Sequence, residues 1–190
     1  MRIINVTPAK AEAAVRQVRA DGREACVCSV ADAPCAIVGS NGGSDEDAAK
    51  FLGILVVHMG NEGGTIVANT GDVDIGIFTN GYSGNDIRDR LIGLISEEVK
   101  ANSGAEIMLD GNDYMVNGRK VIGCGSRMHD GVLYTAMHIA IHSNVELVRK
   151  ICTKRMSKVP GALSEYGVTT EFVTTALQKA IKEYRESGEN

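Results

Sequence analysis

The sequence predicts an α/β protein of the α+β kind, with a mixed, largely antiparallel sheet backed by helices. Segments with the alternating pattern of strands outnumber segments with the period of helices. The strand-like segments also follow one another without regular alternation of strand and helix, which argues against a doubly wound parallel sheet. An Asn-Gly pair between two alternating segments is typical of an antiparallel hairpin.

The first half of the chain predicts two short helices among several strands. Thr7 can cap the first helix, Pro8 fits its first turn and Gly22 ends it. A second helix begins at Ser44, because the acids that follow complement the dipole of a helix N-terminus. The continuous apolar run at residues 54–57 predicts a buried strand. Further strands are predicted at residues 2–6, 24–30, 35–38, 65–68 and 72–78.

The second half begins with a strongly amphipathic helix over residues 87–99, which Gly104 ends. A meander follows, with Asn117-Gly118 as a type I′ turn. Its strands are predicted at residues 107–109, 114–116, 120–122 and, at greater length, 132–142. Two further helices are predicted at residues 144–152 and 170–184. We see no repeat or interdomain linker, so we expect residues 1–190 to form one domain.

Composition excludes several classes of protein. Hydrophobic residues make up 44% and charged residues 23%, as in a globular chain with a real core. The net charge of −4, without a basic run, is not that of a nucleic-acid binder. No apolar run approaches the ~20 residues of a membrane span, and the first residues lack the apolar core of a signal peptide. The five cysteines then indicate a reducing compartment, and we expect a cytoplasmic protein.

Two pairs of metal-ligating residue types fail to complete a metal site. Cys26 and Cys28 lean to one face of a predicted strand, but no second pair accompanies them. His138 and His142 are four residues apart on a predicted strand and therefore lie ~13 Å from each other. That separation is too large for one zinc ion, so we expect a polar sheet face and no metal. Phosphate-loop, dinucleotide-binding and nucleophile-elbow motifs are also missing.

The most informative segment is Gly-Asn-Asp-Tyr-Met-Val-Asn-Gly-Arg-Lys-Val-Ile-Gly-Cys-Gly-Ser-Arg at residues 111–127. The predicted hairpin places Lys120 on a strand immediately after the turn. Gly123 and Gly125 leave room for a ligand to approach the backbone. A lysine held in this way can contact a carboxylate or phosphate as a compact point charge.

The order of residues here resembles the G-N-D-hydrophobic-x-[VI]-[DN]-G-[RK]-K-[IV]-x-G-[SC] segment of the lipoate–protein ligase family, within the biotin/lipoate ligase superfamily. Residues 36–41 resemble the family's first strand and its G-R-N-Q turn. Residues 56–72 resemble its V-x-R-R-x-S-G-G-G-A-V-Y-H-D-x-G-N segment. Residues 129–133 are similar to H-H-G-T-L, and residues 157–177 resemble the family's S-V-P-S-R-V segment and its closing helix. The resemblance covers roughly residues 30–185, and the lysine motif is its most specific part.

The resemblance implies the catalytic-domain fold of the biotin/lipoate ligases and a site for an acyl-adenylate. It implies that Lys120 contacts the carboxyl oxygen and phosphate at the reacting centre. The positions that match ligand-binding residues of the family are Asn61, Gly63, Gly64, Asn112, Asp113 and Gly123. The expected ligands are lipoate or octanoate with ATP, or the acyl-adenylate, with magnesium near Asn112 and Asp113. An apolar tunnel between sheet and helix is expected to hold a chain of about eight carbons.

The resemblance also implies partners. A lipoyl carrier domain is expected to supply the lysine that accepts the acyl group. Many bacterial ligases carry a small C-terminal accessory domain, which we do not expect in this chain. We therefore expect a separate subunit as a possible source of the accessory domain.

The glycine-rich segment departs from the family pattern and keeps three functions open. His58 and Met59 replace its two arginines, Glu62 replaces its first glycine, and Ser40 replaces the arginine of G-R-N-Q. The first interpretation is a minimal lipoate or octanoate ligase, working through an acyl-adenylate. The second is an octanoyltransferase that works through a thioester on Cys124. The third is a divergent protein that binds an acyl ligand or carrier domain without catalysis. We prefer the first and expect the cysteine to be a small buried residue.

Overall fold

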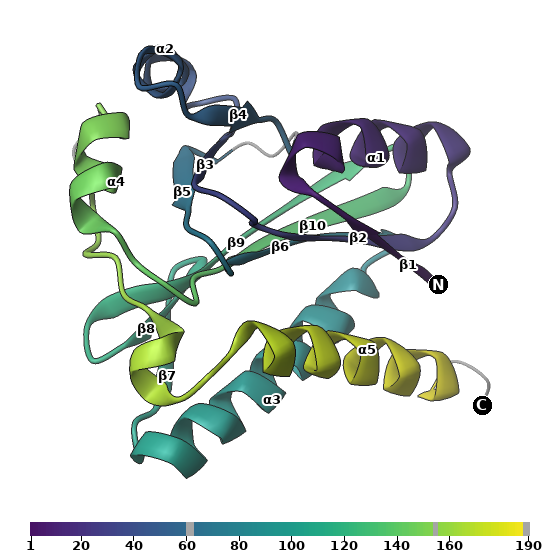
Figure 1. Ribbon diagram of the computed structural model, residues 1–190. Coiled ribbons are helices and arrows are strands. Elements are labelled where there is room, and N and C mark those ends of the chain that lie inside the picture. Colours follow the sequence, from purple (N-terminus) through teal and green to yellow (C-terminus); the bar gives the residue numbers. More distant parts are fainter. Residues whose placement is uncertain (60–62, 154–155, 188–190) are drawn as a thin grey trace.

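The computed structural model describes residues 1–59, 63–153 and 156–187, which form two sheets, five α-helices and one 3₁₀ helix (Figure 1). The large sheet contains, in spatial order, β1 (Arg2–Val6), β2 (Ala25–Val30), β6 (Val73–Asn80), β10 (Val132–Ile139), β9 (Arg119–His129), β8 (Asp113–Val116) and β7 (Ile107–Asp110). The small sheet contains β4 (Leu55–Val57), β3 (Cys35–Val38) and β5 (Thr65–Ala68). The β1–β2 and β3–β4 pairs are parallel and the other described pairs antiparallel, which confirms the predicted fold class.

The helices lie on both faces of the large sheet. They are α1 (Pro8–Asp21), α2 (Gly43–Phe51), α3 (Gly84–Ser103), α4 (Val145–Ile151), the 3₁₀ helix η1 (Leu163–Tyr166) and α5 (Thr170–Ser187). Helices α3 and α5 cover one face, whereas α1 and the small sheet cover the other (Figure 1). Helices α2 and α4 lie on the outer side of the small sheet. In the described part of the chain, no helix is both long and apolar enough to cross a membrane.

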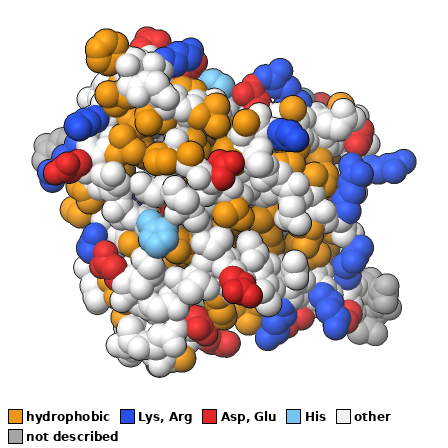
Figure 2. Space-filling model, in the orientation of Figure 1, with side chains coloured by type: hydrophobic (Ala, Val, Ile, Leu, Met, Phe, Trp, Pro, Cys, Tyr) orange, Lys and Arg blue, Asp and Glu red, His pale blue; other side chains and the backbone are white. Residues whose placement is uncertain are grey.

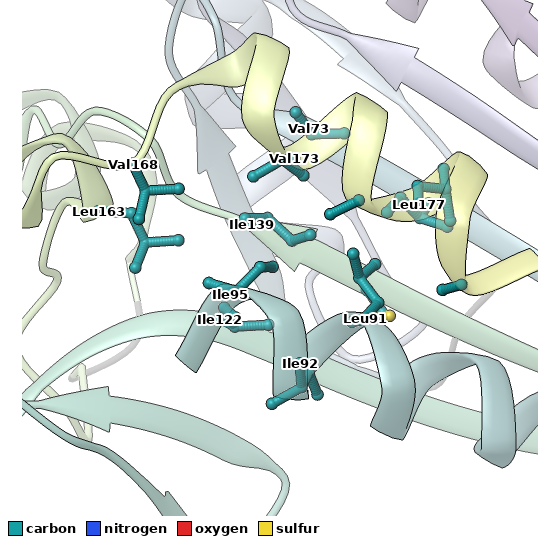
Figure 3. Close-up of a cluster of buried hydrophobic side chains, with 14 of the residues drawn as sticks. Val73, Leu91, Ile92, Ile95, Ile122, Ile139, Leu163, Val168, Val173 and Leu177 are labelled. Carbon is teal, nitrogen blue, oxygen red and sulfur yellow. The ribbon is translucent and has the colours of Figure 1, made fainter. Parts of the chain in front are cut away.

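The larger core lies between the sheet and the α3–α5 pair (Figure 3). Ile122 and Ile139 are register partners on two neighbouring strands, and both side chains point to this face. Leu91 and Ile95 of α3 and Leu177 of α5 meet them there, because residues three or four apart share one side of a helix. Each fully buried side chain of this size stabilises the fold by ~1.5–3 kcal/mol.

A second core joins the two sheets. It contains apolar residues of α1, of β3, β4 and β5, and of β2, β6 and β10. Some apolar side chains stay exposed at the junction of α2 and β4, namely Phe51, Leu52 and Leu55. Figure 2 shows hydrophobic side chains gathered on this side of the molecule, over the region of α4 and the small sheet.

The predicted hairpin at Asn117-Gly118 is confirmed. Both residues have positive φ, 49° and 73°, as a type I′ turn requires, and β8 and β9 flank them as antiparallel partners. The helix predicted at residues 87–99 is also present within α3, packed on the sheet.

Two predicted strand ends and the predicted burial of one strand were wrong. Strand β9 continues through Gly123 and Gly125 to His129, because its pairing with β10 overrides the weak strand propensity of glycine. Strand β10 stops at Ile139, before the predicted end at residue 142, since the backbone N–H groups that follow donate to the carboxylate of Asp72. The run at residues 54–57 is an edge strand and not a buried one, and its Leu55 is 44% exposed.

Candidate functional site

A cleft of about 370 Å³ lies between the small sheet and the α1-facing side of the large sheet. It brings together five of the sequence-predicted residues: Gly63, Gly64, Asp113, Lys120 and Gly123. A cavity of about 170 Å³ shares Lys120 and His138 with this cleft and extends toward α4 and residues 156–161. The two spaces therefore form one continuous groove, whose walls come from segments far apart in the sequence.

Lys120 is placed by an irregularity in the β8–β9 pair. The register shifts between Tyr114, opposite Ile122, and Met115, opposite Lys120, so that β9 carries one extra residue at that point. The lysine backbone is held on its other side, where its N–H donates to Val159 (2.8 Å) and its carbonyl accepts from Gly161 (2.7 Å). The strand, the bulge and this second backbone pairing together fix where the side chain starts.

The ammonium group of Lys120 lies directly over Gly123. A Cβ atom at position 123 would lie 3.0 Å from both Cε and Nζ of the lysine, closer than carbon atoms normally approach. Gly123 lines the cleft, and its expected role in ligand approach stays a prediction. Its missing side chain makes room for Lys120 itself, whereas Gly125 faces open space in the cleft.

Asp113 joins two lysines. Its Oδ1 lies 2.8 Å from Nζ of Lys120, and its Oδ2 lies 3.1 Å from Nζ of Lys158. Lys158 also pairs with Asp110 at 3.1 Å. Limited solvent contact opposes protonation of Lys158, but the hydrogen bonds from both carboxylates raise its pKa above the ordinary value.

Sequence reasoning missed Lys158 as a site residue, although it lies in the Ser-Lys-Val-Pro-Gly segment that resembles a family motif. The same contacts bear on magnesium. The carboxylate of Asp113 is already occupied by two ammonium groups, so its donor set does not fit a magnesium ion. Among the described residues, no group of three or more His, Cys, Asp or Glu side chains could hold a metal.

A row of polar residues crosses the floor of the cleft. Ser29, Asp74, His138 and Gly123 are register partners on β2, β6, β10 and β9. Nδ1 of His138 lies 2.9 Å from Oδ1 of Asp74, and both side chains are almost fully buried. Burial disfavours the charged imidazole, but Asp74 outweighs it and the pKa of His138 is raised. The expected polar sheet face is therefore a buried histidine–carboxylate pair beside Lys120.

Asp72, directly before the first residue of β6, lies next to this polar row. It accepts hydrogen bonds from the backbone N–H groups of Asn69 (2.7 Å), Ile141 (2.8 Å) and His142 (2.8 Å). Its Oδ2 also lies 3.9 Å from Nε2 of His138. Burial raises the pKa of Asp72, while the histidine and the three N–H donors oppose that rise.

A second cross-strand row forms an apolar trench next to the polar one. Gly76, Ala136 and Gly125 are register partners on β6, β10 and β9, and Ala136 and Gly125 leave space above the sheet, whereas the ring of Tyr134 covers Gly76. Ile37 of β3 and Met59 face the cleft from the opposite wall. An unbranched apolar chain fits a space of this shape, with its charged end toward Lys120.

The glycine-rich segment contacts the turn after β3. The carbonyl of Gly64 accepts from the N–H of Gly39 (3.0 Å), and that of Gly63 accepts from Asn41 (3.2 Å). A Cβ at Gly64 would meet no atom within 4 Å, so this backbone lies open to the cleft. Asn61 lies outside the described residues.

Asn112 is not among the described residues that line the cleft. Its side chain is exposed at the β7–β8 turn, and its carbonyl accepts from the N–H of Cys124 (2.9 Å). Asn112 therefore supports the backbone of β9, whereas Asp113 next to it enters the cleft. What these residues do there stays a prediction.

Two cysteines border the cleft, and only one was expected. Cys124 is the register partner of Met137, whose side chain belongs to the core under α3 and α5, so its thiol points away from the polar row. Burial raises the pKa of Cys124 to about 12. Burial likewise raises the pKa of Cys152, which sequence reasoning missed, to about 11. Both thiols therefore stay protonated near neutral pH, the inactive form of a cysteine nucleophile.

No family model matches the sequence, and no curated protein matches it either. Solved structures do match its fold. P. falciparum LipL1 in complex with lipoate superimposes with a TM-score of 0.76 at 17% identity, over 98% of this chain and 62% of that one. Ta0514 of T. acidophilum with bound lipoic acid gives 0.71 at 14% identity, over 97% and 86%.

The chain has the catalytic-domain fold of the lipoate–protein ligases. A lipoate-protein ligase A bound with ATP gives a TM-score of 0.72 at 15% identity, over 97% of this chain and 85% of that one. The biotin protein ligase of Aquifex aeolicus matches with a TM-score of 0.53 at 12% identity, over 98% of this chain and 69% of that one, so the fold is also similar to that of a biotin protein ligase. The chain spans less than two thirds of the length of the P. falciparum protein.

Proposed function

We propose that the protein is a lipoate–protein ligase-like enzyme, with residues 1–190 as one catalytic domain, that attaches a lipoyl or octanoyl group to a lysine of a carrier domain through an acyl-adenylate. One observation carries the proposal. Lys120 lies over Gly123 in a cleft that also contains Gly63 and Gly64, at the end of an apolar trench in a lipoate–protein ligase fold. The trench suits the acyl chain, and the lysine suits the acyl carboxyl group.

The chemistry needs positive charge at one point. In the first step the acyl carboxylate attacks the α-phosphate of ATP and displaces pyrophosphate. In the second step the amine of the carrier lysine attacks the acyl carbonyl, AMP leaves with the bridging oxygen, and the amine loses a proton. Negative charge grows on oxygen atoms in both steps, and a fixed ammonium group beside them lowers both barriers. Lys120 has that role, while Asp113 and Lys158 hold it in place.

The two lysines bound by Asp113 favour a form of this function that carries out only the second step, the transfer from an acyl-adenylate to the carrier lysine. Because the carboxylate of Asp113 binds two lysines, we derive no step through a magnesium ion at that residue. A preformed acyl-adenylate is then a suitable donor, and the enzyme needs only the second step. The alternative thioester mechanism is less well supported, since the thiol of Cys124 is protonated and points away from the polar row.

The partners belong to the same proposal. The acceptor is a lipoyl carrier domain, and a separate subunit supplies the accessory domain. The support is a bipartite lipoate protein ligase of T. acidophilum, studied with its E2 lipoyl domain, which matches at a TM-score of 0.72 and 14% identity over 97% of this chain and 83% of that one.

Mass spectrometry tests the function directly. The protein is incubated with a lipoyl domain and either ATP, magnesium and lipoate or synthetic lipoyl-adenylate. We expect the lipoyl domain to gain the mass of a lipoyl group, at least with the adenylate, and the Lys120→Ala variant to give none above background. A thioester on the protein itself would instead support the transferase. Binding of lipoate without any adduct would leave a non-catalytic binder.

A further inference from the structure

The hydroxyl group of Tyr134 is buried without a hydrogen-bond partner among the described residues. Tyr134 lies on β10, is only 4% exposed, and shares the α1-facing side of the sheet with Ala136 and His138. Its ring stacks on Phe78 at 4.7 Å between centroids, and the guanidinium of Arg19 lies 4.9 Å above it. The ring is therefore held firmly while its polar tip has no described partner.

The ring leans toward the cleft. A Cβ at Gly76 would lie 3.0 Å from Cε2 of Tyr134 and 3.5 Å from its hydroxyl oxygen. Gly76 belongs to the trench row and pairs with Ala136, which lines the cleft. The hydroxyl thus lies above the trench row that contains Gly76 and Ala136. Along the strands, this row is two residues nearer than Tyr134 to the row of Gly123, over which Lys120 lies.

An unpaired hydroxyl group in this place destabilises the fold, because it gives up its hydrogen bonds to water without replacement. Phenylalanine would fill the same space without that penalty. Burial also raises the pKa of Tyr134, so the group remains a hydrogen-bond donor. Buried polar groups without partners are uncommon, and a bound ligand is one source of the missing partner.

The position of the hydroxyl matches one part of an acyl chain. Lys120 lies over Gly123 on β9 and the hydroxyl lies over Gly76 on β6, two residues along the strands (~7 Å) and two strands across (~10 Å), which puts them ~12 Å apart. A hydrogen bond of ~3 Å at each end leaves ~6 Å, which roughly six carbons of an extended chain cover. In lipoate, the sixth and eighth carbons carry the sulfur atoms. Octanoate has no hydrogen-bond acceptor there.

We propose that Tyr134 is a specificity-determining residue, whose hydroxyl donates a hydrogen bond to an acceptor atom near the far end of an eight-carbon acyl chain. This inference rests on the proposed function. Met59 lines the cleft and belongs to the same core cluster as Tyr134. A flexible methionine side chain can move aside for the chain end. The substrate class is then an acyl chain with a distal heteroatom, with lipoyl preferred over octanoyl.

Calorimetric titration of the wild type and of Tyr134→Phe with lipoate and with octanoate tests this. We expect Tyr134→Phe to weaken lipoate binding by about two- to tenfold, the range for one net hydrogen bond, and to leave octanoate binding unchanged or tighter. The ratio of the two affinities, and not either affinity alone, reports the hydroxyl. We also expect the thermal midpoint of ligand-free Tyr134→Phe to rise by a few degrees, because an unpaired polar group is removed.

Tyr166→Phe is the matched control. It also removes one tyrosine hydroxyl, but that group lies 3.4 Å from Nδ2 of Asn117 at the hairpin turn, away from the residues that line the cleft. It should leave the ratio unchanged. An equal effect of Tyr134→Phe on both acids, or no effect on lipoate, would overturn the inference and leave the proposed function intact. If the wild type binds neither acid, this inference fails, and the proposed function fails with it only if lipoyl-adenylate also gives no transfer.

Discussion

At the residue scale, the position of Lys120 depends on the missing side chain of Gly123. The Cε and Nζ atoms of the lysine occupy the space where a Cβ atom at position 123 would lie. Asp113 then fixes the direction of the ammonium group from the neighbouring strand. The missing side chain of Gly123 thus makes room for the side chain of Lys120.

Replacement of Gly123 by alanine should displace Lys120 while the fold survives. The colliding atoms are the far end of a flexible side chain, so the lysine can move at little cost to stability. A shift of ~1 Å at a reacting group can reduce the rate about a hundredfold. We expect a loss of that order in acyl transfer from lipoyl-adenylate, with the thermal midpoint nearly unchanged. Gly93→Ala, where the added atom meets nothing within 4 Å, should retain full activity.

Two further substitutions separate the adenylate and thioester mechanisms. Lys120→Ala removes a preorganised positive group and should lower the transfer rate by about 10²–10³, or ~3–4 kcal/mol. Cys124→Ser should retain most of the activity, because the half-buried thiol points to the other face of the sheet. Rates of both variants with the same acyl donor decide the matter. An inactive Cys124→Ser beside a merely slowed Lys120→Ala would replace the ligase with the transferase.

At the element scale, local signals predicted the hairpin, and non-local pairing built the site. The Asn117-Gly118 turn follows from the conformational preferences of two adjacent residues. By contrast, His138 meets Asp74 only through the register of β10 and β6, 64 residues apart in sequence. Lys158 reaches Asp113 from a segment without regular structure. Sequence periodicity assigns a residue to a face, but it does not say which strand lies beside it.

The polar row across β6 and β10 predicts how stability varies with pH. Because Asp74 raises the pKa of His138 in the folded state, the protonated histidine stabilises the fold. That contribution is fully present below the unfolded-state pKa, about 6.5, and is lost as the pH rises through the folded-state value. We expect the free energy of unfolding of the wild type to fall as the pH rises above about 6.5. Urea denaturation at several pH values measures it.

His138→Gln provides the comparison, since glutamine can still donate to Asp74 but does not titrate. Its free energy of unfolding should depend less on pH over the same range. The folded-state pKa of Asp72 is also raised, so the free energy of unfolding that its protonated form contributes is likewise lost as the pH rises. This loss begins at a lower pH, because the ordinary pKa of the carboxyl group is 3.8. Equal pH slopes for the wild type and His138→Gln would show that the histidine does not titrate differently in the two states.

At the scale of the whole molecule, the cleft exists because two sheets share one core. Residues of α1, of all three strands of the small sheet and of three strands of the large sheet pack in a single cluster. The composition and strand order of the sequence indicated a mixed sheet, and the structure confirms it. The division into two sheets was not predicted, because each short strand is compatible with either sheet until its partners are known.

This shared core predicts that the two sheets unfold together and that a ligand in the cleft stabilises both. A bound ligand at about 100 times its dissociation constant stabilises the folded state by ~2.7 kcal/mol. For a domain of this size that corresponds to a rise of about 5–10 °C in the thermal midpoint. We therefore expect one cooperative transition in calorimetry, shifted by this amount with a non-hydrolysable lipoyl-adenylate analogue.

In Lys120→Ala the same analogue concentration should give a smaller shift, because the ammonium contact is lost. Two separate transitions, only one of which moves with the ligand, would show that the sheets are independent units and that the cleft lies within one of them.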